Sequence, residues 1–161
     1  MPHKATHKKP ADMRNVIPAM MMDNAAKAIE FYAAVLGAKQ KSRLDMPGGK
    51  VAHAELTIGD SSIMLGDACP EMKMPATSNN TYVYIDDVDA AFKKAMDKGA
   101  TEVLKPADQF WGDRTACFRD PFGQQWTIAT HVEDVSDDEV RRRGKEMFDK
   151  QQSKQHGAQA A

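Results

Sequence analysis

The stretch Ala19-Met20-Met21-Met22-Asp23-Asn24 decides the fold, because a similar stretch, Val83-Tyr84-Ile85-Asp86-Asp87, recurs about sixty residues later. Each stretch precedes a run of apolar residues at helical spacing and then a glycine, Gly37 in the first copy and Gly99 in the second. Asp86 lies 63 positions after Asp23, and Gly99 lies 62 after Gly37, so both landmarks keep nearly one register. This repetition indicates a duplicated fold. Two similar half-domains that face each other would form a cleft, where we expect the function.

The first copy is predicted to be a strand, a helix and three more strands. An apolar run over 16–22 is too short for a comfortable helix, and it precedes Asp23 and Asn24, either of which can cap a helix. An apolar stripe at three- and four-residue spacing then runs to Leu36, and Gly37 provides a left-handed exit. Further strands are expected over 38–44, 51–58 and 61–65, which completes a βαβββ unit.

The second copy repeats this order. We expect a strand over 81–85, a cap at Asp86 or Asp87, a helix that ends at Gly99, and three closing strands over 101–104, 115–119 and 125–130. Ser136 and Glu139 then match a capping box at the start of a last helix. The predicted divisions are a disordered tail (1–13), a first module (14–66), a linker (67–80), a second module (81–132), a C-terminal helix (133–150) and a second disordered tail (151–161).

Composition restricts the partners. The 22 basic and 23 acidic side chains leave a formal charge of -1, so no strong field would collect nucleic acid or anionic lipid. No run of eighteen apolar residues occurs, and the N-terminus lacks the apolar core of a secretory signal. The two cysteines, Cys69 and Cys117, are expected to be free thiols. We therefore expect a cytoplasmic protein that contacts neither nucleic acid nor membrane.

The order of several short motifs resembles the vicinal oxygen chelate superfamily of glyoxalases, bleomycin resistance proteins and extradiol dioxygenases, and in particular its PhnB-like branch. The motifs are Ala25-Ala26-Lys27-Ala28-Ile29-Glu30-Phe31-Tyr32, His53-Ala54-Glu55-Leu56, Ile58-Gly59-Asp60-Ser61, Trp111-Gly112-Asp113-Arg114, Arg119-Asp120-Pro121-Phe122-Gly123 and the run from Ile128 to Val135. The resemblance implies an α+β fold in which two paired βαβββ modules form an open, barrel-like mixed sheet, with helices outside and an added C-terminal helix. It also implies pairing of modules within one chain or across a homodimer, and homodimers are common in this branch.

The resemblance also locates the metal ligands that many members carry on the first and last strands of each module. The corresponding positions here are Ile17, Asn80 or Tyr82, Met64 and Thr127. None is a His, Asp, Glu or Cys, and a divalent ion needs three or four such ligands. We therefore predict no metal and no other cofactor at the family's usual place.

A displaced metal site is the alternative. His53 and Glu55 are two residues apart on one predicted strand and hence share a face, so they could supply two ligands or an acid–base pair, with His131 as a third ligand. This would make the chain a glyoxalase- or dioxygenase-type enzyme. The competing interpretation is that both are polar groups on the wetter face of a half-buried strand.

The loop that contains Trp111, Asp113 and Arg114 is a candidate ligand clamp. Trp111 could stack on a planar ring, and Arg114 could bind a carboxylate or phosphate through two hydrogen bonds. Alternatively, Arg114 pairs internally with Asp113 or Asp120 and fixes the loop. We assign Trp126 to the core, which would turn other side chains to the cleft: Met64, Gln125 and Thr127.

Three functions remain open at this point. The first, which we favour, is a metal-independent protein that binds a small, partly aromatic molecule in the cleft. The second is the metal-dependent enzyme with the displaced His53 and Glu55 site. The third is a role in assembly, with the terminal helix docked on a partner subunit.

Overall fold

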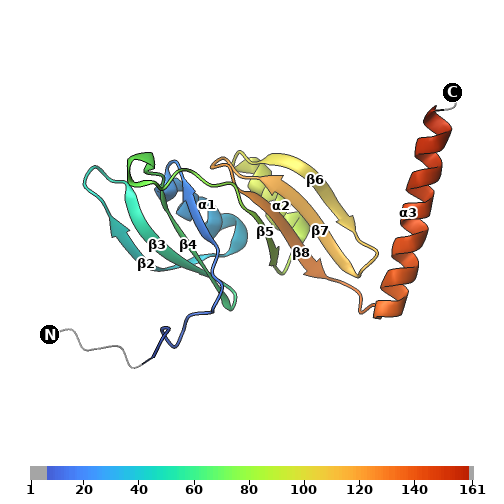
Figure 1. Ribbon diagram of the computed structural model, residues 1–161, viewed down its shortest axis with the longest axis horizontal. Coiled ribbons are helices and arrows are strands. Elements are labelled where there is room, and N and C mark those ends of the chain that lie inside the picture. The colour runs from blue at the N-terminus through green and yellow to red at the C-terminus, as the bar shows by residue number, and fades with distance from the viewer. Residues whose placement is uncertain (1–6, 160–161) are drawn as a thin grey trace.

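The structure is a computed structural model that describes residues 7–159. It contains two modules, each with a four-stranded sheet and one helix, followed by a long C-terminal helix (Figure 1). The first module consists of β1 (Ala19–Met22), α1 (Ala25–Leu36), β2 (Lys39–Asp45), β3 (Val51–Ile58) and β4 (Ser61–Asp67). The second consists of β5 (Asn80–Tyr84), α2 (Val88–Asp97), β6 (Thr101–Asp108), β7 (Asp113–Arg119) and β8 (Gln125–His131), and α3 (Asp137–Gln159) follows it.

The two sheets have the same topology, β1-β4-β3-β2 and β5-β8-β7-β6. In each sheet the first strand of the module runs parallel to the last, and the other neighbours are antiparallel. The α+β class, the duplicated βαβββ order and the C-terminal helix are thereby confirmed. The sheets remain two separate sheets within this chain, so the mixed barrel is open.

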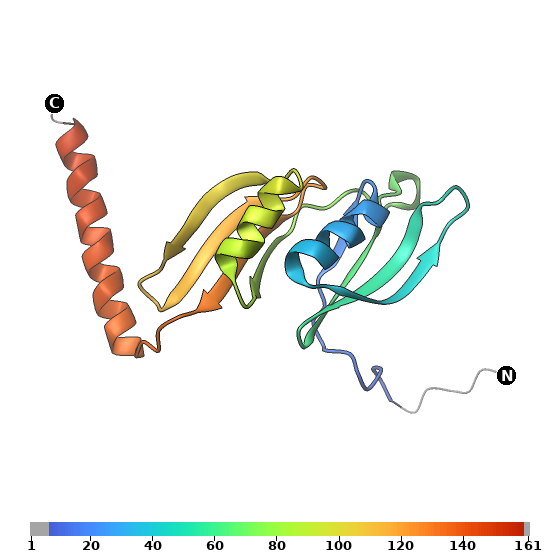
Figure 2. The same ribbon diagram turned by 180° about the vertical axis from the view of Figure 1, so that it is seen from behind.

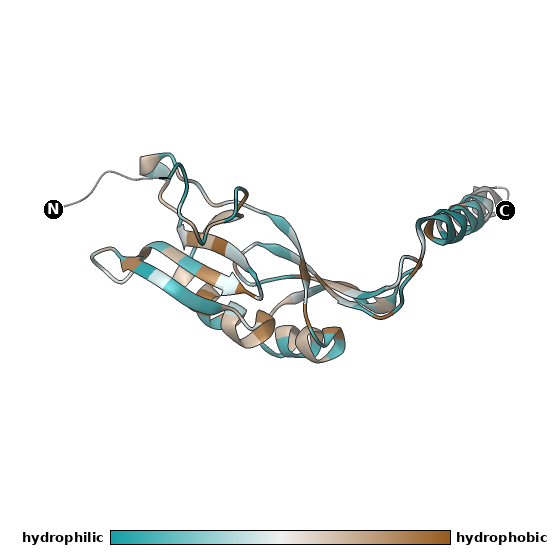
Figure 3. Cartoon of the chain, turned by 90° about the horizontal axis from the view of Figure 1, so that it is seen from below, coloured by the Kyte–Doolittle hydropathy of each residue, from teal (hydrophilic) through white to brown (hydrophobic). Residues whose placement is uncertain are grey.

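Helices α1 and α2 lie on the same side of the two sheets (Figure 2). Their buried residues, such as Ala28 and Ile29 in α1 and Phe92 in α2, pack on the apolar sides of the strands. Seen from below, the pair of helices forms one layer and the sheets form the other, while α3 extends away from both (Figure 3). The opposite side of each sheet, which we call the inner face, is not covered by any helix of residues 7–159.

The two modules also share a buried polar junction. The Asp120 carboxylate accepts hydrogen bonds from the Tyr32 hydroxyl of α1 (2.7 Å) and from the Trp126 indole of β8 (3.0 Å). The rings of Tyr32 and Trp126 meet edge to face, with centroids 5.1 Å apart. Trp126 is therefore a core residue as predicted, and its ring contacts Tyr32 of the first helix.

The two helices begin in different ways. Asp87 caps α2 as expected, because its side chain accepts a hydrogen bond from the Ala90 amide. In α1, Asn24 stands at the N-cap position as predicted, but it adopts a left-handed conformation with φ 62° and its side chain makes no capping hydrogen bond. Asp67, at the end of β4, accepts the Ala25 amide instead (3.1 Å) and also that of Val51 (2.6 Å).

This long-range cap leads to a first prediction. Replacing Asp67 with alanine should lower the free energy of unfolding by about 2–4 kcal/mol, because two buried amides lose their acceptor. Replacing Asp23 with alanine should change it by less than about 0.5 kcal/mol. Urea denaturation of both variants measures the two values. Equal losses of unfolding free energy in the two variants would show that Asp23 contributes as much as Asp67, which would contradict the long-range cap.

Segments outside the modules differ from the sequence prediction in detail. The helix α3 extends to Gln159, whereas a disordered tail was expected from residue 151. The linker holds a short 3-10 turn, Pro70–Met72, and its Thr77 exchanges hydrogen bonds with the Met21 backbone. Residues 1–6 of the predicted N-terminal tail lie outside the described part of the chain. Over residues 7–159, no helix is both long and apolar enough to cross a membrane.

Candidate functional site

The inner face of the second sheet carries a cluster of polar and aromatic side chains. Strand register aligns Tyr82 with Thr127, Tyr84 with Ala129, and Asp113 with His131. Because paired residues in neighbouring strands project to the same side, all of these side chains share the inner face. Trp111, in the turn before β7, reaches the same group.

Asp113 is the centre of this cluster. One carboxylate oxygen accepts hydrogen bonds from the hydroxyls of Tyr82 and Tyr84 (2.8 Å each) and from the Trp111 indole (3.2 Å). The other oxygen lies 2.9 Å from Nδ1 of His131. Asp113 is only 3 % exposed, while Tyr82 and Tyr84 are 45 % and 60 % exposed. We call these five residues the Asp113 cluster: Tyr82, Tyr84, Trp111, Asp113 and His131. The cluster combines a buried carboxylate with aromatic rings that reach solvent.

Backbone geometry holds Trp111 in place. Gly112 has φ 100°, a backbone conformation that residues other than glycine rarely adopt. A methyl group at this position would also clash with the carbonyl oxygen of Glu133. The Gly112 carbonyl in turn accepts the amides of Val132 and Glu133, which ties the turn to the end of β8. The sequence motif of Trp, Gly and Asp thus forms one rigid corner of the site.

Ionisation in the cluster is strongly coupled. Burial acts to raise the pKa of Asp113, but hydrogen bonds from His131, Tyr84, Tyr82 and Trp111 outweigh it, so that this pKa lies below its ordinary value. The same hydrogen bonds act to raise the pKa of the two tyrosines that donate them. Burial, together with the bond to Asp113, raises the pKa of Tyr82, and the bond to Asp113 raises that of Tyr84. Both phenols are therefore neutral donors at neutral pH.

His131 lies between two carboxylates. Its Nδ1 contacts Asp113 and its Nε2 contacts Asp134, each at 2.9 Å. Hydrogen bonds to Asp113 and then to Asp134 raise the pKa of His131 above its ordinary value, since both favour the imidazolium. The cluster therefore favours a positive charge at the end of β8.

A titration experiment tests this arrangement. We expect the His131 imidazole signal in NMR to titrate above pH 6.5, the ordinary value. The raised pKa means that the bond to Asp113 stabilises the fold at lower pH and that this contribution fades as pH rises through the His131 pKa. At the acid end it is lost as pH falls through the lowered Asp113 pKa. The midpoint should fall in an Asp113→Asn variant, and a wild-type midpoint at or below 6.5 would contradict the coupling.

Arg114, proposed above as part of a clamp, projects to the other side of β7. Its guanidinium binds both oxygens of Asp89 in α2 (2.6 and 2.8 Å) and one oxygen of Asp108 (2.8 Å). The internal pair considered from sequence thus exists with different partners, neither of which is Asp113 or Asp120. The structure brings Trp111 and Asp113 together and separates Arg114 from them.

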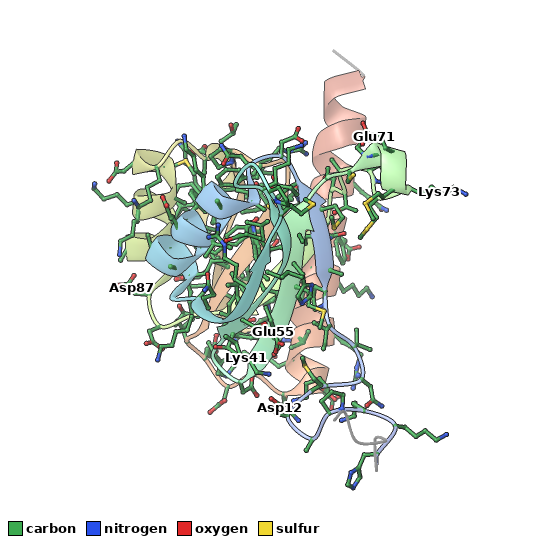
Figure 4. The ribbon with its side chains drawn as sticks, turned by 90° about the vertical axis from the view of Figure 1, so that its left-hand side faces the viewer. Asp12, Lys41, Glu55, Glu71, Lys73 and Asp87 are labelled. Atoms are coloured by element: carbon green, nitrogen blue, oxygen red, sulfur yellow. The ribbon has the colours of Figure 1, made fainter. Side chains whose placement is uncertain are left out.

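The first module places its candidate residues differently. The buried carboxylate of Glu55 accepts hydrogen bonds from Lys41 (2.7 Å) and Ser62 (3.2 Å), and Lys41 also pairs with Asp12 (Figure 4). His53 is exposed on the same strand. Met64, which pairs with both Ala19 and Glu55, is half-buried on the inner face.

A groove of about 350 Å³ lies between the modules. Tyr82 and Tyr84 form part of its wall from the second module, and the hairpin from Ile58 to Ile63 forms another part from the first. Arg14 contributes a cationic side chain at this groove. Gln125 and Thr127 remain half-buried on the inner face, on the opposite side of β8 from Trp126.

The residues present do not fit the metal that the fold family often uses. The inner-face positions of the first and last strands hold Ala19, Met21, Ser62, Met64 and Gly66 in the first module, and Asn80, Tyr82, Tyr84, Gln125, Thr127, Ala129 and His131 in the second. His131 is the single residue of a usual ligand type in that set. Within residues 7–159, no three His, Cys, Asp or Glu side chains lie close enough together to hold an ion, so His53, Glu55 and His131 do not form a triad.

Sequence reasoning missed the two tyrosines as ligand-binding candidates and found His131 only as a metal ligand. The available signal was alternation: Tyr82 and Tyr84 are spaced to share the face of Thr127, which was already assigned to the cleft. The meeting of four donors on Asp113 depends on pairing between distant strands, which a single sequence does not reveal.

Comparison with known proteins agrees with this fold. Residues 17–128 match the family model of the glyoxalase/bleomycin resistance protein/dioxygenase superfamily, and the chain belongs to that superfamily. An uncharacterised protein of Mycobacterium bovis is 36% identical over 133 residues, which cover 77% of this chain and 88% of that protein. A candidate glyoxylase of M. bovis, CFP32, is 31% identical over 111 residues, which cover 68% of this chain but 41% of CFP32.

Solved structures share the architecture. TioX from Micromonospora sp. ML1 superposes with a TM-score of 0.60 at 23% identity, over 74% of this chain and 99% of TioX. A PhnB protein from Bacillus cereus superposes with a TM-score of 0.56 at 16% identity, over 73% of this chain and 99% of that protein. At these identities the likeness shows the fold alone.

Proposed function

We propose that this chain binds a small, partly aromatic molecule against the inner face of the second sheet, without a metal ion. The observation that carries the proposal is the Asp113 cluster, in which one buried carboxylate fixes four side chains from three segments of the chain. Rings held in this way lose little conformational freedom on binding, so they favour tight association with a planar ligand. The adjacent groove of about 350 Å³ is large enough for part of such a molecule.

The chemistry of the cluster suits recognition better than bond cleavage. Asp113 has its hydrogen-bonding capacity taken up by four donors, and both tyrosines are held neutral. In the first module, Glu55 is neutralised by Lys41. These contacts support a binding protein of the resistance type over the enzyme with a displaced His53 and Glu55 site. Within the superfamily, we assign the chain to the PhnB-like branch on the sequence motifs that resemble it.

A thermal-shift screen tests the proposal. The probes are bleomycin, daunorubicin, phenazine-1-carboxylate, quercetin and S-lactoylglutathione, each with EDTA present. A ligand at a hundred times its dissociation constant adds about 2.7 kcal/mol, which for a domain of this size raises Tm by about 5–10 °C. At least one aromatic probe is expected to do this. A shift seen with S-lactoylglutathione alone, and only when EDTA is replaced by an added divalent ion, would favour the metal-dependent glyoxalase-type enzyme. No shift with any probe would contradict the proposal.

We further propose that the chain acts as a homodimer in which the inner faces of the two copies face each other, with the ligand bound between them. Leu44 in β2 and Leu104 in β6 support this, because both are more than 60 % exposed and both lie on an inner face by strand register. Apolar side chains exposed on an open sheet are typical of an interface.

A charge-insertion variant tests the dimer. Light scattering should give twice the 17.8 kDa chain mass for the wild type and a single chain mass for Leu44→Arg/Leu104→Arg. The reason is that two buried, unpaired guanidinium groups would cost more than the interface provides. Gln40→Arg, on the other face of β2, is the matched control and should remain dimeric. A monomeric wild type would exclude this assembly.

A further inference from the structure

The linker between the modules contains a second group of chemically active side chains. Cys69, Met72 and Met74 occur within six positions, and prolines stand at 70 and 75. We call the segment 69–74, which carries these three sulfur-containing residues, the sulfur turn. It lies at the periphery of the first module, where Glu71 and Lys73 belong to the same turn and Lys73 is directed away from the body (Figure 4).

Backbone hydrogen bonds bring the ends of this turn together. Cys69 and Met74 form an isolated antiparallel bridge in which each amide donates to the other's carbonyl, at 2.8 and 3.1 Å. Such a pair has Cα atoms about 5.5 Å apart and projects both side chains to the same side. The Met72 amide donates to the same Cys69 carbonyl (3.0 Å), so hydrogen bonds to Cys69 hold the backbone of both methionines in one turn.

The core does not use these sulfur atoms. Met72 is 68 % exposed and Met74 is 44 % exposed, although methionine side chains more commonly fill the interior. Cys69 is a half-buried free thiol whose hydrogen bond goes to the exposed Glu71 carboxylate at 3.5 Å. A thiol and two thioethers are therefore available to solvent on one short, closed turn.

We propose that the sulfur turn binds a soft monovalent cation, Cu(I), in a three-coordinate site. Thiolate and thioether ligands select Cu(I) over the harder divalent ions, which prefer nitrogen and oxygen. Binding would replace the proton of the Cys69 thiol, which is released to solvent, by a copper–thiolate bond, and the Met72 and Met74 thioethers would complete the site. No change in oxidation state is involved.

Competition with the chromophoric chelator bathocuproine disulfonate, under anaerobic conditions with ascorbate, measures the affinity. One equivalent of Cu(I) should transfer to the wild-type protein. Met72→Leu/Met74→Leu keeps apolar volume but removes both thioethers, and it should weaken Cu(I) binding by at least about 10–100-fold. Cys69→Ser should abolish transfer. All variants are compared by circular dichroism, so a loss of binding can be separated from a loss of fold.

Two matched controls remove sulfur from other places: Met46→Leu in the turn before β3, and Cys117→Ala in β7. Both should bind Cu(I) as the wild type does. Binding that survives Met72→Leu/Met74→Leu unchanged would overturn the proposal in favour of an ordinary surface thiol. Absence of transfer to the wild type would overturn it as well.

Discussion

An Asp120→Ala variant is expected to lose about 3–5 kcal/mol of unfolding free energy, the largest loss we predict for a single substitution in this chain. Asp120 accepts from four donors: the Tyr32 hydroxyl, the Trp126 indole, and the amides of Phe122 and Gln124. It is 4 % exposed, so water cannot readily replace the lost acceptor. Chemical denaturation followed by far-UV circular dichroism measures the effect.

Comparison variants identify the source of this loss. Tyr32→Phe removes one of the four donors and should cost about 1–2 kcal/mol. Asp97→Ala, on the exposed end of α2, removes only a surface pair with Lys93 and should cost less than about 0.5 kcal/mol. In a double-mutant cycle, Asp120→Ala and Tyr32→Phe should be strongly non-additive, because they remove the same contact. Additive effects would mean that the junction between the modules does not depend on this bond.

Asp113→Ala is expected to weaken binding of the best aromatic probe by at least about 100-fold, or roughly 2.8 kcal/mol. Without the carboxylate, Tyr82, Tyr84 and Trp111 lose the acceptor that fixes their rings, so the ligand must meet the cost of ordering them. Quenching of Trp111 fluorescence on titration measures the affinity, with Trp111→Phe to separate its signal from that of Trp126.

The adjacent residue provides the matched control. Arg114→Gln removes a charge next to Asp113 in sequence but on the opposite face of β7, where the guanidinium binds Asp89 and Asp108. Its affinity for the probe should stay within about twofold of wild type, because a surface ion pair contributes little beyond its own site. Equal losses in both variants would indicate a general effect on the second sheet, and a loss confined to Arg114→Gln would restore the clamp suggested by the sequence.

The fold could be predicted from the sequence because its signals are local and repeated. Alternation over 51–58 matches β3 in full, and the glycine exit at Gly37 has the expected positive φ. The cap of α1 could not be predicted in this way, since its acceptor, Asp67, lies 42 residues from the amide that it binds. Only the tertiary structure brings them together.

The candidate site was predicted only in part, because some of its features follow from local sequence patterns and others depend on pairing between distant strands. The motif around Trp111 and Asp113 was singled out, and the face of Thr127 was assigned from the expected core position of Trp126. The direction of Arg114 depends on β7 starting at Asp113, whereas the sequence placed both residues in a loop. The place of His131 beside Asp113 depends on register between β7 and β8, which local patterns do not fix.

The most direct test of the central claim is a fluorescence titration of the wild-type protein with the best aromatic probe, carried out with and without EDTA. Because the Asp113 cluster consists of hydrogen-bonded side chains with no triad of metal ligands, we expect saturable binding with the same dissociation constant in both conditions. Binding that disappears on chelation and returns with an added divalent ion would contradict the account.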